Sequence, residues 1–227
     1  MCGRYLQLSS GAGLAAWFGF EGGPAITPRY NIAPSQSVPV VRQADADGRR
    51  ECVLMRWGLV PSWAKEASFN FSTINARSET VASKPAFRNS FKRRRCLVPA
   101  DGFYEWQATG GKHKQPFVIR PGDGKPLAFA GLWDRWQGPD GDLESMTIVT
   151  TAANDLLRPL HERTPVILPQ EHYALWLDTT VQKPDELTSL MVPYPDALLS
   201  VTPVSTYVSS PRNEGPRCLD PVPGTAP

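Results

Sequence analysis

Short runs of apolar residues, many of them β-branched or aromatic, recur along the whole chain and are separated by Gly, Pro, Asp and Asn. Runs of this length and composition are typical of strands. Turn signals such as Asp101-Gly102 and Gly110-Gly111 lie beside them. The pattern predicts strands at residues 3–8, 38–42, 51–60, 96–99, 103–107, 116–120, 127–133, 146–151, 166–168 and 199–204.

Helical spacing of apolar residues is rarer and its stretches are shorter. Pro85 and Pro159 end two candidate helices, and Pro184 begins another, because proline disfavours a helical residue before it but fits the first helical turn. We expect helices at residues 13–18, 77–83, 154–158 and 170–177, and one that starts at 184. Few short helices among many strands predict a single strand-dominated α+β domain.

The composition supports this interpretation. The chain has 227 residues, of which 23 are Pro and 18 are Gly, and this content argues against long helices. The length fits one domain with a real hydrophobic core. Three of the last nine residues are prolines, so we expect a domain at residues 1–218 and a disordered tail at 219–227.

The charge is nearly balanced overall but uneven along the chain. The formal net charge is +2, which by itself does not indicate a nucleic-acid partner. Residues 84–100, however, hold six basic residues and no acidic one, interleaved with Phe87 and Phe91. Such a run is most often a solvated surface. With exposed aromatic rings it also suits single-stranded nucleic acid, since cations bind phosphates and rings stack on bases.

Cysteine and histidine spacing argues against a metal centre. The four cysteines are 50, 44 and 122 residues apart, and the three histidines are His113, His161 and His172. No secretory signal is convincing, and no run of about 18 apolar residues indicates a membrane span. We therefore expect a cytoplasmic protein with reduced thiols, associated with the nucleoid if it is bacterial, and without a metal or membrane attachment.

Cys2 is the most unusual residue for chemistry. Removal of Met1 makes it the N-terminal residue, with an α-amine and a thiol on one carbon skeleton. The α-amine has a pKa of about 7.7–8.0, so a useful fraction is neutral near pH 7. It can condense with an aldehyde to an imine, and the thiol can then close a five-membered thiazolidine ring. Without other support, a cysteine at position 2 is also explained as a small residue there by chance.

Three further residues are candidates for acid–base chemistry, and each has an ordinary structural explanation. Asn75 precedes a candidate helix and could be a cap or turn residue. Glu105 is flanked by aromatic residues, which raise a carboxyl pKa when they bury it, but strand alternation alone does not decide whether it faces inward. His161 lies in a loop between Pro159 and a predicted strand and titrates near neutral pH, although a lone histidine is more often structural.

Seven ordered segments, covering nearly the whole chain, resemble the SRAP family, the SOS response-associated peptidases or abasic-site-processing proteins. They are MCGRY at 1–5, RYNIAP at 29–34, RWGLVPSW at 56–63, INARSET at 74–80, RRCLVPADGFYEW at 94–106, HERTPVIL at 161–168 and VSTYVSSPRNEGP at 204–216. The resemblance implies an α+β domain with a barrel-like core of curved sheets and short flanking helices.

The resemblance also implies an activity in the DNA damage response. Such proteins bind single-stranded DNA and form a covalent thiazolidine with abasic sites through Cys2, after Met1 is lost by peptidase-type hydrolysis. Carried over by position, Cys2 is the nucleophile, Asn75 positions it, Glu105 handles protons at the sugar and His161 assists the imine chemistry. Removal of Met1 is a hydrolase-type reaction, and the imine gives a latent lyase-type activity. Reaction with the abasic site consumes the protein, so it is largely single-turnover.

The same match assigns contacts to DNA. Arg4, Arg77 and Arg163 correspond to positions that hold phosphates, and Trp63 and Trp106 to aromatic positions near the strand. We expect a monomer without a cofactor, whose partner is single-stranded DNA with an abasic site; protein partners are not visible in the sequence.

The chain departs from the family pattern at three places. Thr164 replaces a methionine beside His161, and Ser209 replaces an asparagine. Residues 65–71 fit the pattern only loosely, and we assign them no role.

Two other functions stay open. A Cys2–His161 pair makes a cysteine peptidase acting on other proteins conceivable, with loss of turnover in Cys2→Ser. A non-catalytic module for single-stranded nucleic acid would need only the basic residues and the aromatic rings.

Overall fold

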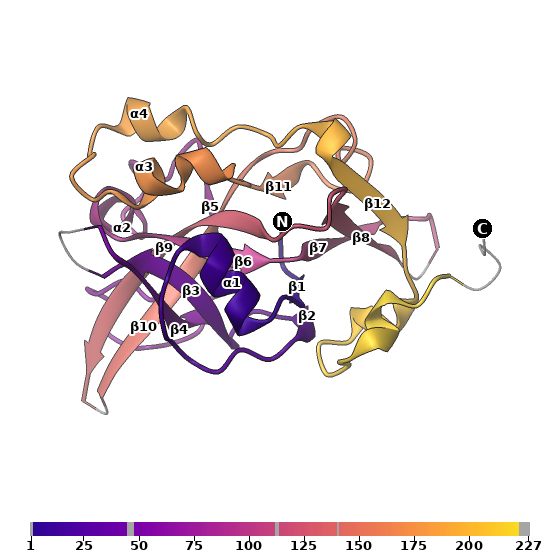
Figure 1. Ribbon diagram of the computed structural model, residues 1–227, viewed down its shortest axis with the longest axis horizontal. Helices are drawn as coiled ribbons and strands as arrows, with labels where there is room; N and C mark the ends of the chain where they lie inside the picture. Colours follow the sequence, from indigo (N-terminus) through magenta and orange to yellow (C-terminus); the bar gives the residue numbers. More distant parts are fainter. Residues whose placement is uncertain (1, 45–47, 112–113, 140, 223–227) are drawn as a thin grey trace.

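The computed structural model describes residues 2–44, 48–111, 114–139 and 141–222, and its centre is a closed five-stranded barrel (Figure 1). The barrel strands are β3 (Ser37–Gln43), β4 (Arg50–Trp57), β6 (Arg95–Ala100), β9 (Leu127–Gly138) and β10 (Gly141–Ala152). Hydrogen bonds join β3 to β4, β4 to β10, β10 to β9 and β9 to β6, and β6 pairs with β3 to close the ring. Only the β4–β10 pair is parallel.

The strands of the barrel carry continuous apolar runs because both of their faces are covered. All six residues of β6 are buried. Cys96 and Val98 belong to one cluster of buried side chains, which we call the barrel cluster and which also holds Val40 and Ile148. Leu97, between them, belongs to a second cluster that faces the helices. A strand buried on both sides shows no alternation of apolar and polar residues.

A second sheet of five antiparallel strands continues from the barrel. In spatial order the strands are β12 (Leu199–Pro203), β8 (Gln115–Pro121), β7 (Gly102–Gln107), β1 (Tyr5–Gln7) and β2 (Arg29–Ile32). Only Asp101 separates β6 from β7, and its carboxylate accepts hydrogen bonds from the backbone of Leu8 and Ser9. These contacts bind the N-terminal strand to the junction of the two sheets.

Two short strands extend one end of the barrel. β5 (Asn75–Arg77) pairs in parallel with β10, with Ile148 opposite Asn75. β11 (Arg163–Pro165) pairs antiparallel with the last residues of β10, with Thr151 opposite Thr164. The end of β10 therefore brings segments near residues 75 and 163 together.

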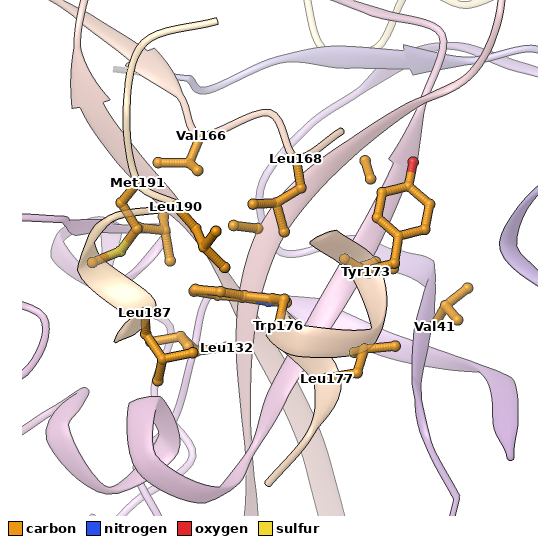
Figure 2. Packing of buried hydrophobic residues seen from close by; sticks show 14 of the residues in the cluster. Val41, Leu132, Val166, Leu168, Tyr173, Trp176, Leu177, Leu187, Leu190 and Met191 are labelled. Atoms are coloured by element: carbon orange, nitrogen blue, oxygen red, sulfur yellow. The ribbon is translucent and has the colours of Figure 1, made fainter. Parts of the chain in front are cut away.

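Short helices cover the outer face of the barrel (Figure 1). They are α1 (Gly11–Phe18), α2 (Arg88–Arg93), α3 (Tyr173–Leu177) and α4 (Pro184–Thr188). In Figure 2, Trp176 of α3 lies at the centre of the helix-facing cluster, with Leu187 of α4 and Leu132 of β9 around it. The described 3-10 turns are η1 (Phe71–Thr73), η2 (Gln170–His172), η3 (Asp196–Leu198), η4 (Thr206–Ser209) and η5 (Pro216–Leu219).

The predicted strand-dominated α+β domain is confirmed, and most predicted strands are present with small shifts of their ends. The strand predicted at 166–168 is wrong: β11 ends at Pro165, and Ile167 forms only an isolated bridge to Phe129. The helices predicted at 77–83 and 154–158 are turns. Pairing of β5 with β10 holds Arg77 in an extended conformation, so the first of these helices cannot start there.

The C-terminal segment lies beside the second sheet. Pro221 bridges to Val204, and Ser205 donates a backbone hydrogen bond to Asp220, 2.8 Å away. Of the tail expected at 219–227, residues 223–227 lie outside the described residues. Within the described ranges, the helices are too short to cross a membrane.

Candidate functional site

Cys2 lies where the N-terminal segment runs along β7. Tyr5 pairs with Phe103, and the Tyr104 N–H donates to the Arg4 carbonyl at 3.0 Å. This antiparallel register carries the first residues of the chain past Glu105. Cys2 is fully buried and belongs to the barrel cluster together with Tyr5 and Ile74.

The surroundings of Cys2 keep its thiol protonated. Burial raises the pKa of this thiol, and the charge of Glu105 raises it further, while a backbone hydrogen bond from Arg4 lowers it. The pairing of Tyr5 with Phe103 brings the first residues of the chain beside Glu105, which is why the charge of Glu105 acts on the Cys2 thiol. A protonated thiol is a weak nucleophile, so a reaction here has to begin at another group or include removal of the thiol proton.

Glu105 points inward, which strand alternation alone did not decide. Its neighbour Tyr104 belongs to a separate apolar cluster with Leu6 and Val118, whereas Phe103 belongs to the barrel cluster. Glu105 is only 6 % exposed, and burial raises its pKa to about 7. A carboxyl group with this pKa exchanges protons near neutral pH and suits both acid and base roles.

Asn75 begins β5 and is buried. Its Nδ2 donates to the Ile74 carbonyl at 3.0 Å, and the Trp57 indole donates to the same carbonyl at 2.9 Å. Its Oδ1 is buried and accepts no hydrogen bond from any described residue. A buried amide oxygen without a donor is costly, and a ligand N–H or O–H at this place would remove that cost.

His161 is half-buried and follows a turn in which its own N–H donates to the Leu157 carbonyl at 3.0 Å. The Arg163 N–H donates to Nδ1 of the imidazole at 2.9 Å, which assigns the proton of the neutral ring to Nε2. Burial lowers the pKa of His161, so the neutral form prevails at pH 7. Gln107, at the end of β7, donates to the Pro159 carbonyl at 3.3 Å and connects this loop to the strand of Glu105.

The fold therefore brings the four predicted site residues from separate parts of the chain toward one end of the barrel. Cys2 and Glu105 meet through β1 and β7, and Asn75 follows Ile74 of the barrel cluster. The turn before His161 contributes Leu157 to that cluster. Their catalytic roles stay predictions.

The predicted DNA contacts differ in their surroundings. Arg4 donates to Asn31 at 2.7 Å and lies over the Trp106 ring, whose indole donates to Ser209 at 3.0 Å. Ser209, which departs from the family pattern, thus still supplies a polar contact. Arg163 forms a two-pronged ion pair with Glu79, at 2.5 and 3.0 Å, and donates to the Thr150 carbonyl.

Arg77 and Trp63 are the exposed members of the predicted set. Trp63 is 62 % exposed, and Arg77 also lies on the surface. Thr164, the other departure, is buried in β11, and its hydroxyl has no hydrogen-bond partner among the described residues. The five DNA contacts stay predictions.

The expectation that Phe87 and Phe91 form an exposed aromatic surface is wrong. Both rings are 1 % exposed and belong to the helix-facing cluster. Arg95 is also buried and donates to backbone carbonyls at the ends of α2 and α3. The basic segment at 84–100 contains an amphipathic helix, α2, which buries Phe91. Basic residues dominate the composition of this segment and mask the helical spacing of its apolar residues.

Sequence reasoning missed two residues that shape the site. Lys114, the residue before β8, lowers the pKa of both Glu105 and His161 through its charge. Glu79 orients Arg163 and has its own pKa lowered by the hydrogen bond from that arginine. Glu79 lies in the INARSET segment, which was a usable signal, whereas nothing in the sequence singles out Lys114. Among the described residues, no group of three His, Cys, Asp or Glu side chains is placed to hold a metal ion.

This fold and site define a β-barrel protein with a buried N-terminal cysteine centre. The family model described as SOS response associated peptidase (SRAP) matches residues 1–211, and the chain belongs to this family. The resemblance stated from the sequence is thereby confirmed.

Relatives and a solved structure agree along nearly the whole length. The abasic site processing protein YoqW of Bacillus subtilis is 38 % identical over 226 residues, covering 97 % of this chain and 99 % of that one. The abasic site processing protein HMCES of Gallus gallus is 37 % identical over 225 residues, covering 86 % of this chain and 66 % of that one. A crystal structure of a protein from Bacteroides thetaiotaomicron has a TM-score of 0.87 at 26 % identity, covering 97 % of this chain and all of that one.

Proposed function

We propose that this chain senses abasic sites in single-stranded DNA and bonds to them covalently through Cys2 once Met1 is removed. The observation that carries the proposal is the position of Cys2 beside Glu105, whose pKa of about 7 suits proton transfer at neutral pH. The names of its relatives, abasic site processing proteins, support the same substrate.

The reaction begins at the α-amine rather than at the thiol. The neutral amine adds to C1′ of the open-chain deoxyribose, and the carbonyl oxygen takes a proton to give a carbinolamine. Loss of that hydroxyl as water needs an acid, which the protonated carboxyl of Glu105 supplies, and leaves a protonated imine and the Glu105 carboxylate. Neutral His161 carries its proton on Nε2 and supports this step by donating a hydrogen bond to the leaving oxygen, while the proton itself comes from Glu105.

Ring closure then protects the strand. The Cys2 thiol gives its proton to the Glu105 carboxylate formed in the previous step, and the sulfur attacks the imine carbon. The nitrogen keeps its proton as its positive charge is neutralised, and the product is a five-membered thiazolidine. An open imine favours β-elimination of the 3′ phosphate, so closing the ring shields the abasic site from strand cleavage. The protein is consumed in the adduct, which makes the reaction largely single-turnover.

The role of Asn75 in this scheme is to hold the amine. Its Oδ1 is buried and accepts no hydrogen bond from the described residues, so it suits an N–H donor from Cys2 or a sugar hydroxyl. Around the reacting centre, Arg4, Arg77 and Arg163 supply cations for phosphates, and Trp63 and Trp106 supply rings for stacking. Such binding weakens as salt rises.

Exposure of the amine requires hydrolysis of the Met1–Cys2 peptide bond. We propose that this is the peptidase-type reaction of the chain and that its usual substrate is its own first residue. Cleavage of other proteins is disfavoured because Cys2 is fully buried and burial raises the pKa of its thiol. We expect the protein to work as a monomer in the cytoplasm, at the nucleoid in a bacterium.

A mapped adduct tests the proposal. Processed protein is incubated with a single-stranded oligonucleotide that holds one abasic site, denatured, digested and analysed by mass spectrometry. We expect a stable adduct on the peptide that starts at Cys2, absent in Cys2→Ser and retained in Cys52→Ser, which alters another buried thiol. An adduct on any other peptide would falsify the assignment, and so would capture by protein that keeps Met1.

A further inference from the structure

The loop that carries Trp63 separates two cavities of opposite character. The first, about 250 Å³, is lined mainly by apolar and uncharged groups, including Leu59, Pro61, Trp63 and Thr73. At about 30 Å³ for each water, it would hold roughly eight water molecules, so it accepts a group larger than an ion. The second, about 340 Å³, is lined by Ser62, Asn89, Lys92, Arg93 and Arg94.

The apolar cavity begins next to the candidate site. Leu59 donates a backbone hydrogen bond to Thr73 at 3.2 Å, and Thr73 lies only two residues before Asn75. Trp63 leaves 62 % of its surface exposed at this cavity, and Phe71 nearby leaves 71 %. Exposed rings that gather around an apolar cavity, unlike single scattered ones, are typical of a binding site.

The loop between the cavities is held firmly. Asp134, which is buried, accepts from the Ser62 N–H at 2.8 Å, and the Trp136 indole donates to the Ala64 carbonyl at 2.7 Å. The residues on both sides of Trp63 are therefore fixed to β9. A ring held this way loses little freedom when it stacks on a ligand, which favours binding.

The charges of the second cavity are only partly balanced. Arg94 pairs with Asp134 and lies over the Trp133 ring. Lys92 and Arg93 are exposed, and neither has an ion-pair partner among the described residues. Two free cations next to an exposed aromatic ring complement a nucleotide, with its phosphate on the cations and its base on the ring.

We infer that the two cavities together bind one nucleotide of the single strand that flanks the abasic residue, its base in the apolar cavity against Trp63 and its phosphate at Lys92 and Arg93. This inference rests on the proposed function, because it takes the strand to be held at Asn75. Since Ser62 of the second cavity and Trp63 of the first are consecutive residues, the two cavities are neighbours, and the nucleotide belongs to only one flank of the lesion.

A ladder of oligonucleotides tests the inference. Each carries a tetrahydrofuran analogue of the abasic site, which binds but cannot react, and is extended by one nucleotide at a time on the 5′ or the 3′ side. We expect affinity to rise in a step on one side only, when the chain reaches the cavities. In K92E/R93E the step should disappear, with an affinity loss on the order of tenfold for long strands at low salt.

Salt dependence gives a second readout. Loss of the one phosphate contact should make the slope of log affinity against log salt less steep by about 0.7, the value for each phosphate of a single strand. Lys125→Glu is the matched control, because Lys125 is exposed and contacts Asp123 and Trp17 on another part of the surface. It should keep the step and change the slope little.

The outcomes separate this inference from the proposed function. An oligonucleotide with a reactive abasic residue that ends before the step of the ladder, and so does not reach the cavities, should form the Cys2 adduct equally in K92E/R93E and in the parent, which also shows that the variant is folded. A ladder without a step, or a step that persists in K92E/R93E, overturns the two-cavity site. Absence of the adduct from every oligonucleotide overturns the proposed function instead, whatever the ladder shows.

Discussion

At the scale of single residues, the pKa of Glu105 sets the expected pH dependence of adduct formation. The carboxyl group keeps its proton up to about pH 7, and the α-amine becomes neutral above about 7.7–8.0. The rate should therefore rise with pH as the amine loses its proton and fall as Glu105 loses its own, with a maximum between about pH 7 and 8. Single-turnover kinetics from pH 5 to 9 measure this profile.

Glu105→Gln is the informative variant for that profile. It should slow adduct formation by about 10² or more and remove the falling limb, because glutamine has no proton to lose in this range. A variant that keeps the parent's falling limb would show that another group causes it.

The same pKa predicts a change in stability. The folded state holds the Glu105 proton up to about pH 7, whereas the unfolded chain releases it near pH 4.3. Glu105 thus contributes most below pH 4, and its contribution is lost as pH rises toward 7. The free energy of unfolding of Glu105→Gln, relative to the parent, should increase by about 3 kcal/mol from pH 4 to pH 8 in denaturant titrations.

Glu79→Gln is the control variant, because its stability relative to the parent should change with pH in the opposite direction. The ion pair with Arg163 lowers the pKa of Glu79, so its contribution is present above the unfolded pKa and lost as pH falls. The variant should become less stable than the parent as pH rises from acid to neutral, although by a small amount because Glu79 is about half exposed. A relative stability of Glu79→Gln that rises with pH would contradict the assignment for Glu79, and one of Glu105→Gln that falls with pH would contradict the assignment for Glu105.

At the scale of elements, Gly102 allows β7 to pack against β8 at the exit from the barrel. A Cβ at this position would lie 2.5 Å from the Ile119 carbonyl oxygen, a backbone atom that cannot move aside cheaply. Gly102→Ala should destabilise the protein by about 1–3 kcal/mol, and it should slow adduct formation because β7 carries Glu105. Gly111→Ala is the control, since its nearest neighbour would be 3.8 Å away, and it should be nearly neutral by thermal denaturation.

Arg95 joins two helices to the barrel without an acidic hydrogen-bond partner. Its guanidinium donates to carbonyls of Phe91 and Lys92 at the end of α2, and of Trp176 and Asp178 at the end of α3. Arg95→Met leaves these carbonyls without donors and should cost about 3–5 kcal/mol. Arg93→Met, on the exposed side of the same helix, should change stability by less than about 0.5 kcal/mol. Equal effects in urea titrations would contradict this account.

Local pattern predicted the elements well where it agreed with pairing and poorly where pairing overrode it. Residues 103–107 are bounded by turn signals and form β7 as predicted. Residues 75–77 have a helix-like context but form β5, because β10 offers them backbone partners at its end. Intrinsic helix propensity is weak, and the hydrogen bonds offered by a neighbouring strand edge outweigh it.

At the scale of the whole molecule, every thiol is buried: Cys2, Cys52 and Cys96 belong to the barrel cluster and the helix-facing cluster, and Cys218 belongs to the apolar cluster of the second sheet. Cys2, Cys96 and Cys218 are fully buried, and Cys52 is 4 % exposed. In native protein without Met1, Cys2 becomes the chain end, where local opening costs least, so it should be the first thiol to react with a thiol reagent, while the other three react only on unfolding. Rapid labelling of Cys96 in the native state would show that the barrel opens more readily than this packing implies.

The sequence by itself determined the strand-rich class, the family and the identity of the candidate residues, because short apolar runs and the ordered segments are local properties. The tertiary structure alone decided three features. It closed five strands into a barrel and turned Glu105 inward beside Cys2. It also buried Phe87, Phe91 and Arg95, which the basic segment had suggested were exposed. The physical reason is that burial, and with it each pKa, depends on contacts between residues far apart in the chain, which local spacing does not specify.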